Sequence, residues 1–416
     1  MRIAVFIKST TFSKDYGGLE TQNKVLCEGL AARGHEIVVF SPATTNEGRF
    51  AFDSRNGRRD PGPISRGECE PAAHNITNGV TYIFIPCVYR LLLASIDKNN
   101  WVNRSYQEFL KYHQEKPFDA VISQSSAGLG IIKRKRELGI KIVGISHGTI
   151  GGEMKTLLNS AKGAGDVIKS AKSLAFGTVN YFGRQREYIH GCDRVVAVSS
   201  VVKESIINET FASAEKIIVI HNGIDGSKIP KKNWGDTEVG EPFKILYIGR
   251  IEESKGLREL LIACRDVGGV FVNIVGDGPF LEELKDLSRQ YKMSQKVLFY
   301  GKLPYEKVVE TYTCNDVFVL PTKRVEGLPM TLVEACFAGL PIIATNMGGN
   351  KDVVDNQLNG FLLDKLNTDV LKAKIVELSK NQNLAKNMGL NGKIKAEKEF
   401  TLDRMIDSYE GVLRSL

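Results

Sequence analysis

Short apolar runs alternate with amphipathic helical patterns along the first half of the chain. Residues 3–8 form an apolar run with β-branched side chains, which predicts a buried strand. Residues 20–34 show helical periodicity and end at Gly34, a residue suited to a helix C-terminus. Residues 36–40 have the pattern of a second strand. A strand, loop, helix and strand of this length form a βαβ unit, so we expect a parallel sheet.

The same alternation continues to about residue 225. Further strands are expected at residues 119–124, 141–146, 195–199 and 217–222. One helix is expected to contain residues 131–138, and another follows the strand at 195–199 and runs through Ile207. Residues 44–79 differ, because they are rich in Gly, Pro, Asn and Arg and lack periodicity. This stretch predicts a long loop or a partly disordered insertion. Residues 226–242 are polar and contain Gly, Lys and Pro, which is typical of a linker between domains.

After the linker, the alternation of strands and helices starts again. Strands are expected at residues 244–248, 270–275, 297–300, 317–321, 341–345 and 360–363, and helices at residues 256–267, 281–291, 305–313 and from about 329. The pattern predicts an α/β protein with two doubly wound, Rossmann-like domains, residues 1–225 and 243–399, facing across a cleft. A charged helix at about residues 400–416 is a candidate to pack back on the first domain.

The composition narrows the class of protein. The 416 residues are 42% hydrophobic and 25% charged, as in water-soluble globular proteins. The seven cysteines include no CxxC pair, which argues against a disulfide framework or a zinc cluster and favours a reducing compartment. The N-terminal apolar run is too short for a signal peptide, and no stretch is long enough to cross a bilayer, so we expect a cytoplasmic protein. The net charge of +8 suits ordinary solubility, or an anionic partner such as nucleotide phosphates, acidic lipid or nucleic acid.

The segment from Glu326 to Glu334 carries the strongest candidate chemistry. It follows a predicted strand, and Pro329 suits the first position of a helix. The backbone N–H groups of the next three residues would then be free at the positive end of the helix dipole, which is an anion site. These residues are Met330, Thr331 and Leu332. The two carboxylates can flank one bound group and accept hydrogen bonds from sugar or ribose hydroxyls, although two solvated glutamates near a helix start are also common.

Four more elements follow predicted strands of the same sheet. Arg250 and Lys255 lie in a loop that leads into a helix and would suit a diphosphate without a metal, or form an ordinary basic loop. Gly276 lies in a tight turn that allows close backbone approach. Backbone atoms of Lys302 and Leu303 would lie at a strand end, where they could contact a base. Residues 339–349 are a buried strand followed by a Gly-Gly loop.

Together these residues resemble glycosyltransferase family 4, the group 1 glycosyl transferases with the GT-B fold. The first half resembles the acceptor domain of that family through Gly17-Gly18 and residues 193–199 and 219–225. The resemblance implies a retaining, metal-independent transfer from a nucleotide diphosphate sugar, UDP- or GDP-linked, that serves as co-substrate, with no cofactor. In such enzymes the leaving phosphate is thought to help deprotonate the acceptor hydroxyl, so no side chain is assigned as the general base.

The resemblance also assigns roles to residues. Glu326 would contact the donor sugar near the reacting carbon, with Gly327 and Leu328 beside it, and Glu334 would bind the ribose. Arg250 and Lys255 would neutralise the diphosphate, Gly18 would let the backbone approach it, and His147 would face the sugar. Without the family, His147 would simply be a histidine at a strand end. Two residues depart from the pattern of the family. Pro329 stands where many members have Gly, and Asp352, with a shorter side chain, stands where a Glu is expected.

Fewer motifs indicate where the acceptor would bind. Relatives often use glycan or lipid-linked acceptors at the cytoplasmic face of a membrane. Basic residues interleaved with aromatic and aliphatic ones would suit docking to anionic lipid, or form a solvated charged face. They are Lys133, Arg134, Lys135, Arg136, Lys155, Lys162, Lys169, Lys172, Arg184 and Arg186, with Leu174, Phe176, Tyr181 and Phe182 among them. Lys323 and Arg324 could hold an acceptor phosphate.

Three classes of protein other than a transferase are alternatives. A sugar-nucleotide epimerase of the same fold is disfavoured by the combined set of Arg250, Lys255, Glu326 and Glu334. A catalytically inactive nucleotide-binding protein is disfavoured because the motifs are intact. A nucleic-acid partner is not expected, since the basic residues match no nucleic-acid-binding motif.

Overall fold

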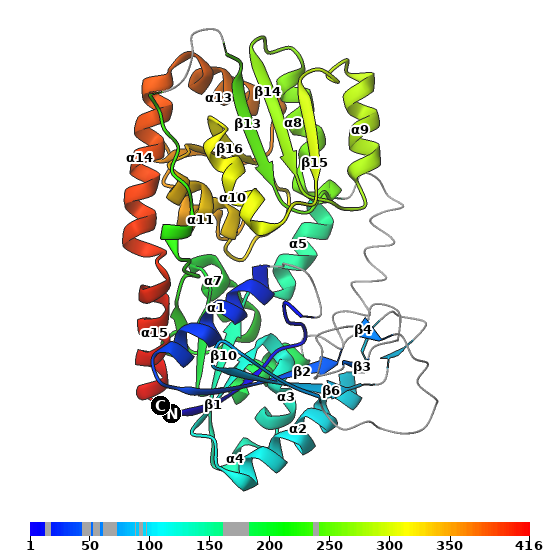
Figure 1. Cartoon of the computed structure of the whole chain (residues 1–416), viewed down its shortest axis with the longest axis vertical. Helices are drawn as coiled ribbons and strands as arrows, with labels where there is room; N and C mark the ends of the chain where they lie inside the picture. The colour runs from blue at the N-terminus through cyan, green and yellow to red at the C-terminus, as the bar shows by residue number, and fades with distance from the viewer. Residues whose placement is uncertain are drawn as a thin grey trace.

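The chain folds into two α/β domains stacked end to end (Figure 1). The computed structural model describes residues 1–12, 18–43, 51–52, 59–60, 73–87, 89–90, 95–96, 98–160, 183–235 and 241–416. The N-terminal domain is built on an eight-stranded sheet and the C-terminal domain on a six-stranded sheet.

The N-terminal sheet has the order β12-β11-β10-β9-β1-β2-β6-β5. Its strands are β1 (Arg2–Phe6), β2 (Glu36–Ala43), β5 (Ala73–Thr77), β6 (Val80–Pro86), β9 (Ala120–Gln124), β10 (Lys141–Ser146), β11 (Arg194–Ala197) and β12 (Ile217–Val219). All neighbours are parallel except the β5–β6 pair. Short strand pairs β3 (Ala51–Phe52) with β4 (Arg59–Asp60) and β7 (Tyr89–Arg90) with β8 (Ser95–Ile96) lie outside this sheet.

Helices cover both faces of this sheet, as a buried parallel sheet requires. They are α1 (Gly18–Ala32), α2 (Lys98–Glu115), α3 (Leu129–Ile132), α4 (Lys135–Leu138), α5 (Ile150–Ser160) and α7 (Ser200–Thr210). The central strands are continuous apolar runs, and their side chains form the core between sheet and helices. Phe6 of β1 stacks on Phe40 of β2 with ring centroids 5.0 Å apart, and Phe109 of α2 packs against both rings.

The C-terminal sheet is entirely parallel, in the order β15-β14-β13-β16-β17-β18. Its strands are β13 (Phe243–Ile248), β14 (Val270–Val275), β15 (Val297–Gly301), β16 (Val317–Leu320), β17 (Ile342–Thr345) and β18 (Gly360–Leu363). The chain starts in the middle, moves to one edge, returns and moves to the other edge. The order therefore reverses between β13 and β16, and ligands of such sheets bind at the carboxyl ends of strands at that switch point.

The helices of the C-terminal domain lie on both sides of its sheet (Figure 1). They are α8 (Leu257–Arg265), α9 (Leu281–Gln290), α10 (Tyr305–Thr313), α11 (Met330–Ala338), α12 (Asn350–Val353), α13 (Thr368–Lys380) and α14 (Gln382–Glu399). A short 3-10 turn, η4 (Glu253–Lys255), leads into α8.

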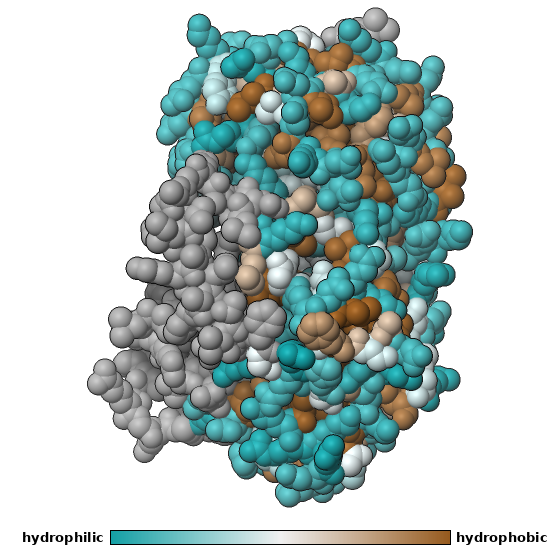
Figure 2. All heavy atoms as spheres, turned by 180° about the vertical axis from the view of Figure 1, so that it is seen from behind, coloured by the Kyte–Doolittle hydropathy of each residue, from teal (hydrophilic) through white to brown (hydrophobic). Residues whose placement is uncertain are grey.

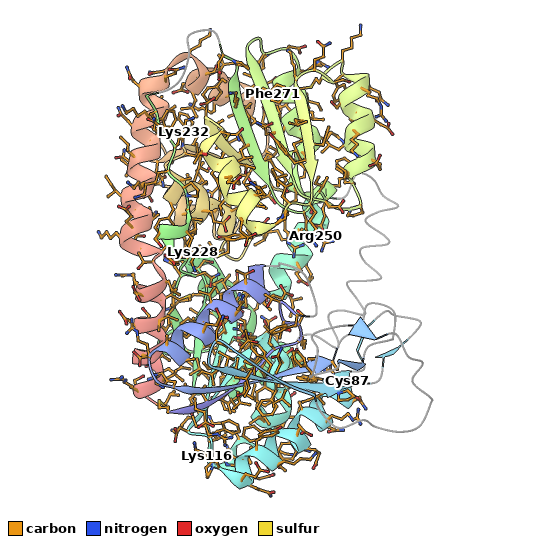
Figure 3. All side chains as sticks on the ribbon, viewed as in Figure 1. Cys87, Lys116, Lys228, Lys232, Arg250 and Phe271 are labelled. Carbon is orange, nitrogen blue, oxygen red and sulfur yellow. The ribbon has the colours of Figure 1, made fainter. Side chains whose placement is uncertain are left out.

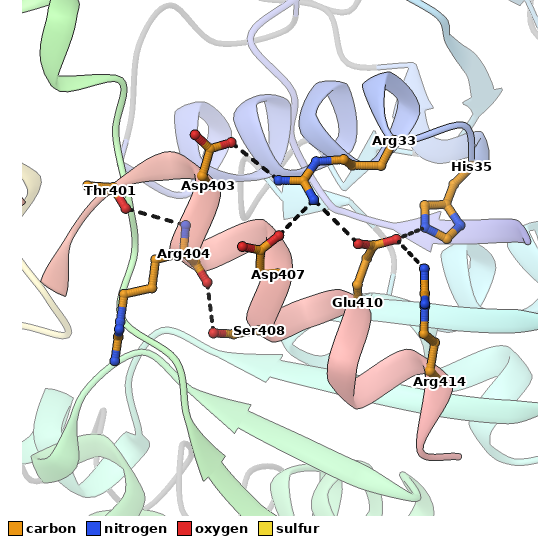
Figure 4. Close-up of polar contacts among 9 residues, drawn as sticks. All are labelled: Arg33, His35, Thr401, Asp403, Arg404, Asp407, Ser408, Glu410 and Arg414. Carbon is orange, nitrogen blue, oxygen red and sulfur yellow. Dashed lines mark hydrogen bonds and ion pairs between the residues drawn. The ribbon is translucent and has the colours of Figure 1, made fainter. Parts of the chain in front are cut away.

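The C-terminal helix α15 (Leu402–Arg414) crosses back to the N-terminal domain and lies along α1 (Figure 4). Arg33 at the end of α1 forms ion pairs with Asp403, Asp407 and Glu410 of α15. His35 contacts the same Glu410, with 2.7 Å between Nε2 and Oε1. The chain thus crosses between the domains twice, at residues 220–242 and near Phe400. At the crossing the Ile224 N–H donates to the Phe400 carbonyl and the Leu402 N–H donates to the Ile224 carbonyl, both at 2.9 Å.

Two sequence predictions were wrong in the N-terminal domain. Residues 44–79 do not form only a loop, because β5 pairs with β6 around Asn78 and Gly79, both at positive φ. An Asn-Gly pair is a hairpin turn signal that could have revealed this strand. The predicted helix over residues 131–138 is broken between α3 and α4, where Arg134 leaves the helical conformation and its guanidinium lies 4.2 Å from the ring centroid of Tyr106.

Candidate functional site

Two charged residues meet at the switch point of the C-terminal sheet. Lys255 ends the turn that follows β13, and Glu326 lies in the loop that follows β16. The Lys255 Nζ atom lies 2.6 Å from Glu326 Oε1, and the Thr322 hydroxyl donates to the same oxygen at 3.0 Å. Both charged side chains are largely buried, at 16% and 13% exposed. The sequence prediction placed these two residues near one ligand, and the fold brings them into contact.

Glycine at position 256 permits this approach of the two loops. Gly256 has φ +71°, a conformation that favours glycine, and a Cβ atom there would lie 1.9 Å from the carbonyl oxygen of Pro321. The turn that carries Lys255 therefore packs directly on the end of β16. A larger residue at 256 would separate Lys255 from Glu326.

Arg250, the second predicted cation, has a different partner. Its guanidinium is 66% exposed and pairs with Glu252, with 3.0 Å between Nη2 and Oε1. Figure 3 shows Arg250 at the end of the C-terminal domain that faces the N-terminal domain. Because an exposed ion pair is weak, a phosphate could replace Glu252 at little cost. Within the described part of the chain, no group of three or more His, Cys, Asp or Glu side chains could hold a metal ion.

The N-terminus of α11 differs from the prediction in one respect. Pro329 is the N-cap residue, with ψ +115°, rather than the first helical residue. Its carbonyl accepts a hydrogen bond from the N–H of Leu332 at 3.1 Å, so the prediction that Leu332 offers a free N–H was wrong. Among the described residues, no hydrogen bond uses the N–H groups of Met330 and Thr331. These two N–H groups remain suited to an anion.

Glu334 lies in the second turn of α11 and is held by two tyrosines. The Tyr312 hydroxyl donates to Glu334 Oε2 at 2.7 Å, and the Tyr305 hydroxyl donates to Oε1 at 3.3 Å. Tyr305 and Tyr312 are two turns apart on α10, so one face of that helix presents both hydroxyls. Burial raises the pKa of Glu334 to about 7, and the two hydrogen bonds only partly oppose this rise. Sequence patterns do not reveal this pair of tyrosines, because the contact joins separate helices.

The two domains touch at Gly327 and His147. A Cβ atom at Gly327 would lie 2.0 Å from the His147 carbonyl oxygen and 3.4 Å from a methyl group of Val198. Next to this contact, the N–H of Val325 donates to the Thr156 hydroxyl of α5 at 2.9 Å. Figure 1 shows α5 between the two domains. The Glu326–Gly327 segment is therefore part of the domain interface, and His147 lies across that interface from it.

The imidazole of His147 is fixed by a buried amide. Its Nε2 atom lies 2.7 Å from the Gln124 side-chain oxygen. The Gln124 amide nitrogen donates to the side-chain oxygens of Gln22 at 3.2 Å and Asn23 at 3.1 Å. Although solvent reaches part of His147, burial lowers its pKa to about 4, and this residue is neutral at physiological pH. Sequence analysis identified His147 but missed Gln124.

Asp352 has a partner despite its short side chain. Its carboxylate accepts hydrogen bonds from the Ser200 N–H and hydroxyl, both at 2.6 Å, and lies 3.0 Å from His221 Nε2. Ser200 begins α7 of the N-terminal domain, so an anion at a helix N-terminus joins the two domains. Burial acts to raise the pKa of Asp352, but the His221 and Ser200 hydrogen bonds outweigh it and lower that pKa.

The other predicted binding residues have different environments. Gly276, at φ +137°, lies against the carbonyl of Gly249, where an added Cβ atom would be 1.9 Å away. Lys302 is exposed, and Leu303 and Leu328 pack against the core. Gly18 begins α1 and has open space where a side chain would be. Gly17 lies outside the described residues.

A separate hollow lies at the opposite end of the C-terminal sheet. It measures about 420 Å³ and is lined by residues that include Glu241, Phe243, Asp266 and Lys380. Phe243 begins β13, so the hollow is at the amino end of that strand, away from the loops that carry Lys255 and Glu326. It contains none of the predicted site residues.

The basic residues of the N-terminal domain are partly engaged within the protein. Lys133 pairs with Glu187 at 3.3 Å and Lys135 with Asp193 at 2.7 Å. Lys323, a candidate for an acceptor phosphate, pairs with Glu259. The predicted residues Lys162, Lys169, Lys172, Leu174, Phe176, Tyr181 and Phe182 lie outside the described residues.

Two observations bear on membrane contact. No helix in the described part of the chain is both long and apolar enough to cross a bilayer. On the face shown in Figure 2, hydrophobic residues lie in small groups among hydrophilic ones. Neither observation identifies a docking surface.

Comparisons with known proteins cover both domains. The family model for "Glycosyltransferase Family 4" matches residues 16–228, and the model for "Glycosyl transferases group 1" matches residues 229–395. An uncharacterized glycosyltransferase of Methanocaldococcus jannaschii is 29% identical over 54% of this chain and 59% of its own length. A GDP-mannose-dependent alpha-(1-6)-phosphatidylinositol monomannoside mannosyltransferase of Mycobacterium tuberculosis is 27% identical over 54% of this chain and 62% of its own length.

Solved structures are similar over the whole chain. HepE from Anabaena in complex with UDP superimposes with a TM-score of 0.73 at 16% identity, covering all of both chains. This likeness confirms the predicted fold, two Rossmann-like domains in the GT-B arrangement. The curated relatives are matched over only about three fifths of their own lengths.

Proposed function

Because the chain belongs to glycosyltransferase family 4, we propose that it is a retaining hexosyltransferase that uses a nucleotide diphosphate sugar. The bond between the anomeric carbon of the sugar and the diphosphate breaks, and a bond to an acceptor hydroxyl forms on the same face. The acceptor proton passes to the leaving phosphate. No metal or other cofactor is part of this proposal.

The contact between Lys255 and Glu326 carries the proposal. A cation and a carboxylate meet at the switch point of the C-terminal sheet, and the carboxylate residue comes four residues before α11, which begins with the N–H groups of Met330 and Thr331. The cation and the N–H groups suit the diphosphate, and the carboxylate suits sugar hydroxyls. Because Lys255 and Glu326 neutralise each other before the donor binds, neither charge is buried alone. A bound donor would exchange this ion pair for contacts of both residues with its own groups.

Each predicted residue then has a role that follows from its position. Lys255 and Arg250 stabilise the negative charge that develops on the leaving diphosphate. Glu326 holds the donor sugar, and Glu334 accepts hydrogen bonds from the ribose. Gly327 lets the N-terminal domain close on the donor until His147 reaches the sugar.

The acceptor and location are proposed from relatives. One relative is named a phosphatidylinositol monomannoside mannosyltransferase. Two others are named a "Lipopolysaccharide 1,6-galactosyltransferase" and a "Putative colanic acid biosynthesis glycosyltransferase". We therefore propose a glycan or lipid-linked glycan acceptor of cell-surface polysaccharide or glycolipid synthesis. A cytoplasmic protein that contacts the inner, anionic face of the membrane would meet such acceptors.

A binding and turnover experiment tests this function against its alternatives. Nucleotides and nucleotide sugars are screened by thermal shift, since a ligand that binds only the folded protein raises its melting temperature. Positive donors are then incubated without acceptor, and the products are identified by NMR. Slow release of free sugar in the α configuration of an α-linked donor supports the proposal. An epimerised nucleotide sugar supports the epimerase alternative, and binding without turnover supports an inactive nucleotide-binding protein.

A further inference from the structure

A buried threonine holds one of the two oxygens of the Glu326 carboxylate. Thr322 lies just after β16 and is fully buried, at 0% exposed. Its Oγ1 atom lies 3.0 Å from Glu326 Oε1 and 3.4 Å from the Ser254 carbonyl oxygen, and it accepts a hydrogen bond from the Arg324 N–H at 3.0 Å. A hydroxyl has one proton to donate, and a carboxylate is a stronger acceptor than a carbonyl. The shorter contact to the charged oxygen therefore takes the proton of Thr322.

The backbone around Thr322 is fixed by two neighbouring segments. The hydroxyl of Thr345, a fully buried residue of β17, donates to the Thr322 carbonyl at 2.5 Å. The N–H of Lys323 donates to the Ser254 carbonyl at 2.7 Å, which ties this loop to the turn that carries Lys255. The Thr322 hydroxyl therefore points at Glu326 from a position that β17 and the η4 turn both set.

The two oxygens of the Glu326 carboxylate have different environments. Oε1 receives the Lys255 ammonium at 2.6 Å and the Thr322 hydroxyl. Among the described residues no hydrogen bond reaches Oε2, and Oε2 is not one of the buried polar atoms without a partner. Solvent therefore reaches Oε2, and this is the oxygen that can accept a hydrogen bond from a ligand.

Donor binding would leave Thr322 as the contact that orients Glu326. In the proposed function Lys255 turns to the diphosphate, so the carboxylate loses its charged partner. The glutamate side chain has several rotatable bonds, and without a contact at Oε1 it would sample rotamers that carry Oε2 away from the sugar. In the described part of the chain, Thr322 is the other residue that donates a hydrogen bond to this carboxylate.

We propose that Thr322 is a positioning residue, whose hydroxyl holds Glu326 Oε1 so that Oε2 stays directed at the donor sugar after Lys255 has turned to the diphosphate. The proposal rests on the proposed function and adds to it the residue that fixes the sugar-binding carboxylate. Because Thr322 is fully buried, it acts on the sugar only through Glu326. Loss of its hydroxyl should therefore affect the sugar and its transfer, and not the binding of a nucleoside diphosphate.

The test compares variants that differ in this hydroxyl. Thr322→Val removes the hydroxyl and keeps the branched shape, and Thr322→Ser keeps the hydroxyl. Thr210→Val is the matched control, since Thr210 is 1% exposed and its hydroxyl donates to the Ile206 carbonyl at 2.7 Å within α7, outside the site. The probes are UDP with UDP-glucose and UDP-galactose, and GDP with GDP-mannose. Calorimetry measures the affinity for UDP and GDP, and release of free sugar from the nucleotide sugar that the wild type accepts measures turnover.

Thr322→Val should release sugar at least about tenfold more slowly than the wild type, the value of one hydrogen bond to a charged group. Its affinity for UDP or GDP should be unchanged, because Lys255 and the N-terminus of α11 are intact. Thr322→Ser and Thr210→Val should release sugar at close to the wild-type rate. A loss of UDP or GDP affinity that parallels the loss of turnover would mean that the whole loop has moved, and would overturn the positioning role.

A second comparison shows whether the effect passes through Glu326. Thr322→Val is added to Glu326→Ala, and the residual release of sugar is measured over longer incubations. If Thr322 acts only by holding Glu326, the added substitution should cause no further loss. Loss of packing or of the Arg324 contact would instead slow both backgrounds by the same factor. Equal losses in the two backgrounds would therefore overturn the proposal.

Failure of the positioning role and failure of the proposed function give different results. Turnover at the wild-type rate in Thr322→Val overturns the positioning role and leaves the proposed function standing. A wild type that binds none of the probes, or binds them without turnover, overturns the proposed function and the positioning role with it. If Thr322→Val does not fold, Thr322→Ala, which also lacks the hydroxyl, takes its place in both comparisons.

Discussion

Replacing Glu334 with glutamine should stabilise the protein at alkaline pH while weakening donor binding. Burial raises the pKa of this carboxyl from 4.5 to about 7. The folded state therefore binds more protons than the unfolded state between these values, and stability falls as the pH rises through this window. Because one pKa unit corresponds to about 1.4 kcal/mol, ionised Glu334 costs the folded protein about 3 kcal/mol above pH 7. Glutamine keeps the shape and can hydrogen-bond to Tyr305 and Tyr312 without that cost.

The assay is urea unfolding of the wild type and of Glu334→Gln at pH 5 and at pH 8. The difference in unfolding free energy between the two proteins should be small at pH 5 and should favour the variant at pH 8 by up to about 3 kcal/mol. Comparing the variant with the wild type at each pH cancels the titration of all other groups. A difference that is the same at both pH values, or a variant that is less stable at pH 8, would refute the reasoning about Glu334.

Three further predictions concern the domain interface and the nucleotide site. Gly327→Ala should reduce turnover of the donor by at least about 100-fold, because the new methyl group would collide with the His147 carbonyl, yet nucleotide binding to the C-terminal domain should survive. A turnover assay and calorimetry of nucleotide binding measure the two effects. Turnover at the wild-type rate would contradict the close contact. Asp352→Asn should destabilise the contact with Ser200 and His221 by about 1–3 kcal/mol and widen the distribution of domain arrangements in small-angle X-ray scattering, and an unchanged scattering profile and stability would argue against this role. Nucleotide affinity of the wild type should fall as the pH drops below 7, when Glu334 takes up a proton, and should be nearly flat with pH in Glu334→Gln; parallel pH profiles of the two proteins would show that Glu334 does not bind the ribose.

The sequence could place the candidate residues of the C-terminal site at one edge because they follow strands of one parallel sheet. Strand periodicity places Lys255 after one strand and Glu326 after another, and both strands end at the same edge. The strand order, which makes those two strands neighbours, cannot be read from periodicity. Only the fold shows that β13 lies beside β16 and that Lys255 contacts Glu326.

The residues that sequence analysis missed act through contacts between distant elements. Gln124 ends a buried strand and looks like part of the core, but it connects α1 to His147. Tyr312 fits the apolar face of its helix, and its hydroxyl acquires a role only when α10 packs beside Glu334. The free N–H of Leu332 was wrongly predicted because the first turn of α11 closes with a 3-10-type hydrogen bond from that N–H to the Pro329 carbonyl.

The central claim is that Lys255 and Glu326 form the donor site at the domain interface. The most direct measurement is the rate of release of free sugar from the preferred nucleotide sugar by the wild type, Lys255→Ala and Glu326→Ala. Lys285→Ala is the matched control, since Lys285 forms an exposed ion pair with Glu282 on α9 of the same domain. We expect a loss of at least about 100-fold in both site variants, with folding intact and the control unchanged. Turnover at the wild-type rate in either folded site variant would contradict it.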